Sequence, residues 1–417
     1  MPIDLNLLPK PLTLKKGLSR LFWCITLVVF IIISVILICL NQPNYRIGIE
    51  HIIIAVIFAF IGWIILLLIS LLFRGYKEFY VEGWNKLRED RKQELIEFGQ
   101  KPVYVIFNQL HSEFGDEDHA QALINGLLSI DAKTALPSSD YNNPIIHSRF
   151  KFNNLKNSDF SLKIDELFNE LQEVIFILNS KVFQKKQKHI RIFIDVPISS
   201  ELIKLSWEKK LGLTSFFDSW SVVDVKESSI FLDSWLDNSE NNDHILCCIS
   251  LHLYDFPHSY SSEAMTSMIC LGKNIFQSDS TIQYIRENKL TVAALHRTQE
   301  SDNLDDTLEY AELWGDFNIE EGNQHPIGAI WLNKLTSDIN VRVLSRYVDK
   351  ACSIDNIYHI NTTFGIPGEC DYWVGLAFAI EHASFINEKQ LVIGEKQNRF
   401  HATIIEGIDI EKENNIL

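Results

Sequence analysis

The sequence predicts an α/β protein in which an N-terminal transmembrane α-hairpin precedes a duplicated βαβαββ domain. Three observations carry this prediction. Two apolar runs without a charged residue, 21–40 and 52–73, are each long enough to cross a bilayer. Beyond residue 100, short apolar runs typical of buried strands alternate with amphipathic helical patterns. That order occurs twice, which predicts two consecutive halves of similar architecture.

The two apolar runs predict membrane spans rather than soluble helices. At about 1.5 Å of rise per residue each run forms a helix of roughly 30 Å, the thickness of the hydrocarbon core of a bilayer. A buried soluble helix would show a polar face or end sooner. A signal peptide is the main alternative, but its apolar region would be shorter, no small-x-small cleavage site follows, and a second span comes at once.

Basic residues orient the predicted hairpin. The flanks that precede 21–40 and follow 52–73 are rich in lysine and arginine, whereas the connection between the two runs contains only Arg46. Cytoplasmic flanks of membrane spans carry an excess of these residues. We therefore expect both termini to lie in the cytoplasm. The basic residues are Lys10, Lys15, Lys16 and Arg20 before the hairpin, and Arg74, Lys77, Lys86, Arg88, Arg91 and Lys92 after it.

Charge separates the chain into a basic and an acidic part. Residues 1–93 hold 11 Lys or Arg and 6 Asp or Glu, whereas residues 94–417 hold 27 and 48, so their net charges are +5 and −21. The acidic part argues against nucleic acid as a partner, and the basic collar suits anionic membrane lipids. Seven scattered cysteines without a CxxC pair are typical of a reducing compartment.

The domain boundaries follow from these patterns. We predict a cytoplasmic head (1–20), the hairpin (21–73), a juxtamembrane helix (74–100), a first half (101–280) and a second half (281–417). In the juxtamembrane part the helical pattern covers 76–98, and Gly99 is a plausible stop.

Each half contains apolar strands and helices in a similar order. A largely parallel, buried sheet follows from such alternation, and duplication would give two sheets that share a central layer of helices. In the first half we predict strands at 103–108, 189–196, 244–253 and 265–271, and helices at 162–184, 200–210 and 228–237. In the second half we predict strands at 290–295, 357–360, 390–393 and 399–405, and helices at 327–350 and 371–382.

Three short motifs in this order resemble the thiolase-type fold of β-ketoacyl synthases. Residues 261–272 (SSEAMTSMICLG) resemble the small-residue strand that closes the first half of those enzymes. Residues 295–298 (LHRT) resemble a strand end with a catalytic histidine, which would be His296. Residues 361–376 (NTTFGIPGECDYWVGL) resemble the glycine turn and helix that carry a second histidine. The resemblance implies a thiolase-like duplicated domain.

The departures from that family imply a degenerate catalytic site. A synthase needs a cysteine where the helix N-terminus of the first half stabilises a thiolate, and residues 220–229 (WSVVDVKESS) contain none. The turn Phe364-Gly365-Ile366 carries no histidine at the second position. Only His296 would remain, either as an acid–base residue or as a hydrogen-bonded histidine at a strand end. We therefore expect a domain that is not an enzyme.

The whole layout is similar to the lipase-adaptor proteins of type VI secretion systems. The shared features are a membrane hairpin, an exit helix ending in LIEFGQKPVYVI and a degenerate thiolase-like domain with the LHR motif. This resemblance implies a pseudoenzyme in the bacterial inner membrane that binds a secreted lipase effector and a secretion spike protein. Two alternatives remain: a membrane-bound acyl-transfer or lipid-modifying enzyme that uses His296 with an unrecognised nucleophile, and a membrane sensor that binds an acyl ligand.

A second candidate site follows the first cytosolic strand. His111, Glu113, Asp116 and His119 are oxygen and imidazole ligands that could hold a divalent metal. They lack the spacing of a known metal motif, and a solvated loop explains them equally well. The acidic run 302–316 is typical of a solvated loop and helix face. Since neither GxGxxG nor GxxxxGK[ST] occurs, we expect no nucleotide, and we predict no cofactor.

Overall fold

The computed structural model divides the chain into two compact units, Ile3–Leu95 and Ile96–Leu417, each described by itself. The residues that it describes are 3, 5–15, 17, 19–41, 49–133, 144–152, 159–211, 216–317, 327–348 and 350–410. Lys16 and residues 42–48 of the predicted connection, which include Arg46, lie outside this part of the chain.

Two long helices dominate the first unit. α1 (Arg20–Asn41) and α2 (Ile49–Gly99) are long and apolar enough to cross a membrane, judged by length and composition. α2 continues past the predicted span, so the predicted span and juxtamembrane helix are parts of one helix, which ends at Gly99 as predicted. The two helices meet where the Trp63 indole donates to the Trp23 carbonyl at 3.0 Å.

The N-terminal segment lies along α2. It contains a short 3-10 turn, η1 (Leu5–Leu7). The Asn85 side chain accepts a hydrogen bond from the Leu12 amide at 2.9 Å and donates one to the Leu12 carbonyl at 3.0 Å. Arg88 donates to the Pro9 carbonyl at 2.7 Å. These contacts place residues 9–12 beside the polar part of α2.

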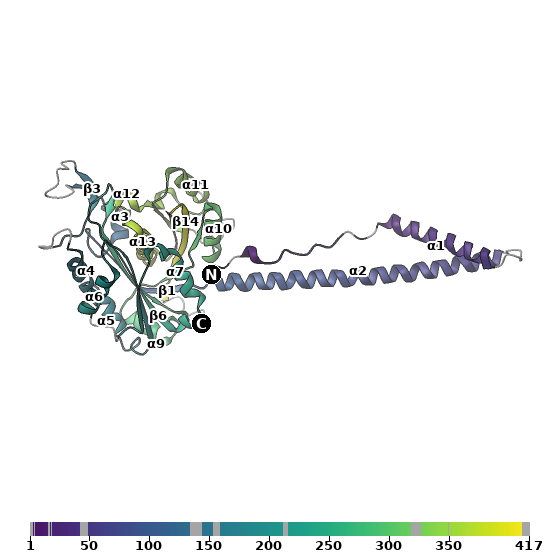
Figure 1. The fold of residues 1–417 in the computed structure, drawn as a ribbon, viewed down its shortest axis with the longest axis horizontal. Coiled ribbons are helices and arrows are strands. Elements are labelled where there is room, and N and C mark those ends of the chain that lie inside the picture. The colour runs from purple at the N-terminus through teal and green to yellow at the C-terminus, as the bar shows by residue number, and fades with distance from the viewer. Residues whose placement is uncertain are drawn as a thin grey trace. The chain divides into compact units, whose positions relative to one another are not determined.

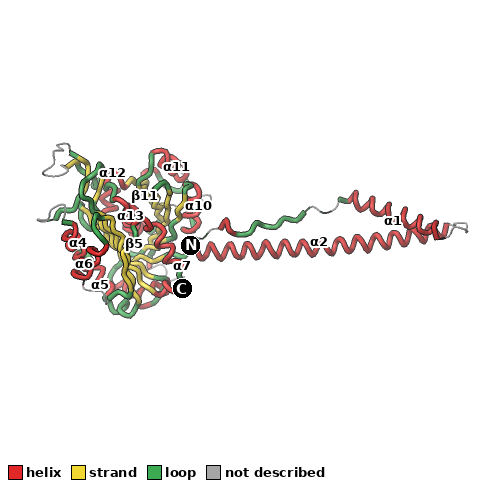
Figure 2. The backbone as a smooth tube through the Cα atoms, viewed as in Figure 1, coloured by secondary structure: helices red, strands yellow, loops and turns green. Residues whose placement is uncertain are grey.

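The second unit contains one long mixed sheet. Figure 2 shows its strands as a twisted band, in yellow, flanked by helices. The strands of the first half are β1 (Val103–Ser112), β4 (Gln187–Asp195), β5 (Ser219–Val223), β6 (His244–His252) and β8 (Ala264–Leu271). Those of the second half are β9 (Ala293–Leu295), β11 (Ile327–Asn333), β12 (Ile357–His359), β13 (Lys389–Lys396) and β14 (Arg399–Gly407). β10 (Gln299–Ser301) pairs with β14 beside this path.

The two halves of the sheet repeat the same topology. The described strands follow the order β12-β11-β13-β14-β9-β1-β8-β6-β4-β5. If each half is numbered in chain order, both read 3-2-4-5-1, with strands 3, 2 and 4 parallel and strand 5 antiparallel to its neighbours. This identity confirms the predicted duplication of the α/β unit.

Two details of the predicted sheet are wrong. The halves do not form separate sheets, because their first strands, β1 and β9, pair antiparallel and join them. The sheet is also mixed rather than largely parallel. The reason is that the fifth strand of each half returns as an antiparallel neighbour of the fourth, and then pairs antiparallel with the first.

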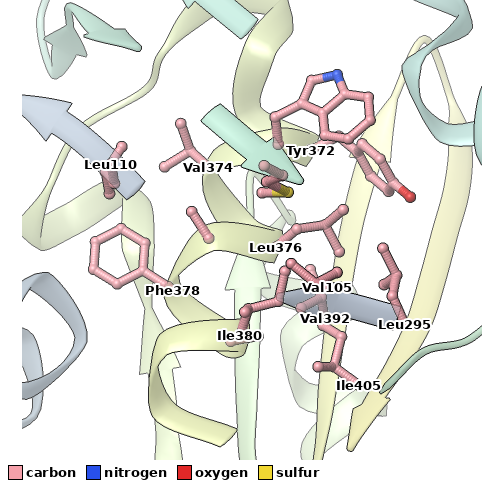
Figure 3. Close-up of a cluster of buried hydrophobic side chains, with 14 of the residues drawn as sticks. Val105, Leu110, Leu295, Tyr372, Val374, Leu376, Phe378, Ile380, Val392 and Ile405 are labelled. Atoms are coloured by element: carbon pink, nitrogen blue, oxygen red, sulfur yellow. The ribbon is translucent and has the colours of Figure 1, made fainter. Parts of the chain in front are cut away.

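Helices cover both faces of the sheet, and α13 lies at the centre of the domain (Figure 1). Figure 3 shows Leu376 and Ile380 of α13 beside Val105, Leu295 and Val392, which belong to strands of both halves. α13 is apolar on nearly every face because both halves bury it. The helices are α3 (His119–Ile124), α4 (Phe160–Asn169), α5 (Gln172–Leu178), α6 (Ser200–Leu211), α7 (Ser228–Asp237), α8 (Lys273–Phe276), α9 (Asp279–Glu287), α10 (Leu304–Trp314), α11 (Ser337–Tyr347), α12 (Ile360–Thr363) and α13 (Asp371–Ile386).

Short elements complete the fold. A small sheet lies apart from the long one, in the order β2-β3-β7. Its strands are β2 (Ala132–Lys133), β3 (Ile145–Ser148) and β7 (Ser261–Ser262). Further 3-10 turns are η2 (Val225–Glu227), η3 (Ser239–Asp243), η4 (Ile354–Asn356) and η5 (Gly368–Cys370).

Two predicted helices were wrong in extent. The segment 327–350 begins with the fully buried strand β11 and becomes helical only in α11. A continuous apolar run such as IGAIWLN has no period that separates a buried strand from a buried helix. The predicted helix 162–184 consists of two helices, α4 and α5, because the chain turns at 170–171.

Candidate functional site

The loops of the two halves meet at the carboxyl ends of the parallel strands. β4 ends at Asp195 and β6 at His252, and these residues are register partners in the sheet. Asp195 Oδ2 lies 2.9 Å from His252 Nδ1 and accepts a hydrogen bond from the Glu369 amide at 2.9 Å. Burial opposes the ionisation of Asp195, but the contact with His252, the hydrogen bond from Glu369 and the nearby Lys396 charge together hold the pKa of Asp195 below its usual range. The carboxyl edge of such a sheet is the usual place for a ligand.

Gly368 allows the loop before α13 to approach Asp195 and His252 closely. The predicted tight turn before α13 is confirmed, since Gly365 and Gly368 have φ angles of +103° and +56°. A Cβ atom at residue 368 would lie 2.3 Å from both the Asp195 carboxylate and the His252 ring. A larger residue is therefore excluded there. The loop that precedes α13 is thus pressed against the strand ends of the first half.

Lys396 makes the reciprocal contact from the second half. It ends β13, and its ammonium group donates to the Val225 carbonyl at 2.9 Å in the turn before α7. The same group lies 3.2 Å from a carboxylate oxygen of Glu369. At this junction the Lys396 ammonium forms an ion pair with Glu369, and the His252 ring contacts the Asp195 carboxylate.

The start of α7 carries hydroxyl groups instead of a thiol. Ser228 donates to the Val225 carbonyl at 2.5 Å, and Ser229 donates to a Glu300 carboxylate oxygen at 2.5 Å. Both serines are buried. A serine hydroxyl is a weak nucleophile. The hydrogen bond that Ser229 donates to the Glu300 carboxylate does not make the hydroxyl as reactive as a cysteine thiolate. The site implied by the thiolase resemblance thus contains no reactive sulfur at this helix.

Cys370 occupies the corresponding position before α13, and the sequence interpretation missed it. It is the N-cap residue of that helix and is fully buried. Burial raises the pKa of its thiol well above the usual range, and nearby Asp195 and Asp371 act in the same direction. The sulfur lies 3.9 Å from the Phe193 carbonyl. A buried thiol that stays protonated serves as a small core residue rather than as a nucleophile.

A buried polar cluster links four elements beneath these loops. The Thr298 amide donates to Asp233 at 3.1 Å, and the Thr298 hydroxyl lies 2.7 Å from the Tyr372 hydroxyl and 2.5 Å from that of Thr403. Burial raises the pKa of Asp233 to about 7, although the charge of Arg297 opposes this shift. The cluster ties α7, the segment after β9, α13 and β14 together.

His296 lies away from this cluster, at the end of β9. It is 7% exposed, and its Nε2 atom is 4.0 Å from a Glu406 carboxylate oxygen. The ring lies beside the backbone of Gln100 and Trp314. Burial lowers the pKa of His296 to about 4, so the ring is neutral at pH 7. Among the described contacts, none joins His296 to Ser228 or Ser229.

The four candidate metal ligands are separated into distinct contacts, and His111 lies within β1, which extends beyond the predicted end at residue 108. His111 Nδ1 lies 2.8 Å from Asp116 Oδ1, and His119 Nε2 lies 2.9 Å from the Ser112 hydroxyl. Burial lowers the pKa of His119 to about 4. These hydrogen bonds pin the turn between β1 and α3.

Glu113 belongs to a different network. Its carboxylate accepts from the Lys133 ammonium at 2.5 Å and from the Arg149 amide at 3.1 Å, which joins β1 to the small sheet. Within the described ranges, no three or more His, Cys, Asp or Glu residues are gathered in a way that could hold a metal ion.

Comparisons with known proteins find similarity to solved structures at the level of the fold. No family model matches the chain, and no curated relative does. Solved structures that it resembles include the peroxisomal 3-ketoacyl-CoA thiolase of Saccharomyces cerevisiae, at 7% identity and a TM-score of 0.45, with 74% of this chain and 98% of that chain covered. Another is the ishigamide ketosynthase/chain length factor, at 9% identity and a TM-score of 0.49, with 74% and 100% covered. Human mitochondrial 3-ketoacyl-CoA thiolase matches at 7% identity and a TM-score of 0.43, with 75% and 100% covered. At these values the likeness is one of chain architecture and transfers neither residues nor activity.

Proposed function

We propose that this chain is a membrane-anchored adaptor, without catalytic activity of its own, that holds a type VI secretion lipase effector for delivery to the secretion spike. We infer the identity of the partner from the resemblance in layout and motifs to the lipase-adaptor proteins. The observation that best supports a non-catalytic role is the start of α7, where Ser228 and Ser229 stand in place of a cysteine and donate hydrogen bonds to neighbouring acceptors. The buried thiol of Cys370 does not replace it.

The proposed location is the bacterial inner membrane, with both termini in the cytoplasm. The basic flanks of the two apolar runs support this orientation. The contacts of Leu12 with Asn85, and of Pro9 with Arg88, support the same conclusion in part. If α1 and α2 cross the membrane, these contacts require the N-terminal segment and the polar end of α2 to lie on one side.

Charge suggests the chemistry of the partners. The domain from residue 94 onward has a net charge of −21, which favours an effector with a basic face. The basic residues that follow the second apolar run favour anionic lipid headgroups. Complementary charge mainly raises the rate of association, and salt screens it over about 8 Å at physiological ionic strength.

Affinity purification of the full-length chain from membranes, followed by mass spectrometry, tests this function. We expect a lipase effector and a spike protein to be enriched relative to an unrelated membrane protein with the same tag. The His296→Ala variant should capture the same proteins, because a scaffold needs no acid–base group. Turnover of an acyl thioester by the purified chain would instead support the enzyme alternative, and saturable binding of a fatty-acyl ligand without a lipase partner would support the sensor.

A further inference from the structure

The last turn of α2 belongs to the folded domain. The compact unit of the domain begins at Ile96, and Gly99 is buried. The Gln100 amide donates to the Ile96 carbonyl at 2.9 Å, which closes the final helical turn before β1 begins at Val103. The last carbonyls of a helix lack partners within the helix, so an unsupported end frays. The contacts of this turn show what supports it.

Arg297 covers the aromatic residue of this turn. Its guanidinium carbon lies 5.1 Å from the centroid of the Phe98 ring, and its Nη1 atom lies 2.8 Å from Asp237 Oδ1. The arginine is only 2% exposed, and its side-chain nitrogens make no well-aligned hydrogen bond. Its buried charge is therefore compensated by a carboxylate and a ring face. Both interactions are stronger when water is excluded.

Gln100, which follows the last turn of α2, binds the carboxyl end of α10. The Gln100 side-chain amide donates to the Leu313 carbonyl at 3.0 Å and lies 3.3 Å from Asp316 Oδ1. The Lys389 ammonium donates to the Gly315 carbonyl at 2.7 Å and to the Asp316 carbonyl at 2.9 Å, which holds that segment against β13. Gln100 thus binds a fixed platform rather than a loose loop.

The buried ring of His296 lies at the same helix end. Its neutral ring lies beside the backbone of Gln100 and Trp314, and its own amide donates to the Ile404 carbonyl at 3.1 Å. The side chain is thereby enclosed by the end of α2, the end of α10 and β14. This position suits a packing residue between the helix end and the sheet.

We infer that His296, Arg297 and the segment Leu313–Asp316 form a socket that anchors the last turn of α2 in the domain. This assignment gives the LHR motif a mechanical role. Leu295 lies in the sheet, His296 packs against the helix end, and Arg297 clasps Phe98. The role goes beyond the proposed adaptor function, and the socket would exist whatever partner the domain binds.

Hydrogen–deuterium exchange on the full-length chain in detergent tests the socket. Arg297→Lys retains the charge but loses the planar group over Phe98, and Phe98→Leu retains an apolar residue but loses the ring. In both variants we expect amide exchange at 97–101 to become at least tenfold faster, while β6 and α13 keep their protection. Arg342→Lys is the matched control, because that half-exposed arginine pairs with the exposed Asp305.

Two results of the exchange experiment on Phe98→Leu would overturn the inference. Unchanged exchange at 97–101 in Phe98→Leu would show that the ring does not hold the helix end. Faster exchange throughout the domain in Phe98→Leu would assign the ring to the core instead, and would equally reject a local anchor. Phe98→Leu decides the question if Arg297→Lys does not fold.

Discussion

Ser228 and Ser229 stand where a nucleophile would profit most from a helix N-terminus, yet the residues around them suppress that benefit. Their hydroxyls donate hydrogen bonds to the Val225 carbonyl and to the Glu300 carboxylate, respectively. A neighbouring carboxylate disfavours an anion at the same place, whereas the helix dipole favours it. At 2.5 Å, the full charge of Glu300 should outweigh the partial charge of the helix end.

This balance predicts the behaviour of a cysteine placed in the site. In the Ser229→Cys variant the thiol should have an apparent pKa above its usual 8.5, because Glu300 opposes the thiolate. Alkylation by iodoacetamide as a function of pH measures that pKa. The additional change Glu300→Gln should lower it. An apparent pKa below 7 in Ser229→Cys alone would mean that the site still activates a nucleophile.

Asp233 predicts a pH dependence of stability. Its pKa is raised to about 7 in the folded chain, whereas an unfolded aspartate has a pKa near 3.9. Between these values the folded state binds the proton and the unfolded state does not, so this group lowers stability as pH rises from 4 to 7. Three pKa units correspond to about 4 kcal/mol.

The Asp233→Asn variant removes this loss and retains an acceptor for the Thr298 amide. The difference in stability between the variant and the unaltered chain should grow in favour of the variant as the pH rises from 4.5 to 7.5. The unfolding midpoints of both chains, measured at these two pH values, give this difference. A difference that is independent of pH would show that Asp233 is ionised in the folded state.

At the scale of elements, the sequence predicted those with a clear period or a clear stop. α7 has the predicted bounds, α13 begins at the predicted residue, and α2 ends at Gly99. β11 was misread because all seven of its residues are buried, so no alternation marked it as a strand. Burial on both faces removes the signal on which such a prediction depends.

The hairpin gives a prediction about topology. An alkaline phosphatase reporter, which is active only in the periplasm, should be inactive when fused after residue 417 and active when inserted near Asn44. The physical reason is the excess of basic residues on the flanks of both apolar runs compared with their connection. The reverse pattern of activity would refute the proposed orientation.

At the scale of the whole molecule, the contacts between the halves could not be read from the sequence. Asp195 and Glu369 are 174 positions apart, and Lys396 and Val225 are 171 apart, yet each pair is in contact. The available signal was weaker: Asp195, His252 and Lys396 each end an apolar strand. The motif 295–298 begins at the end of a strand, as predicted, but the position of His296 beside Gln100 depends on the fold.

Duplication explains why these contacts are reciprocal. The loop before α13 binds the strand ends of the first half, and the end of β13 binds the turn before α7. A duplicated sheet brings both helix starts to one junction. In this chain the junction is occupied by ion pairs and hydrogen bonds.

The most direct test measures binding and turnover in one sample. The full-length chain in lipid nanodiscs is mixed with the lipase recovered from membranes, at about 50 and 500 mM salt, and acyl thioester consumption is followed alongside association. The adaptor account predicts saturable binding, an association rate that falls as salt rises, and no turnover. Turnover of the thioester, or no binding of the lipase at either salt concentration, would contradict it.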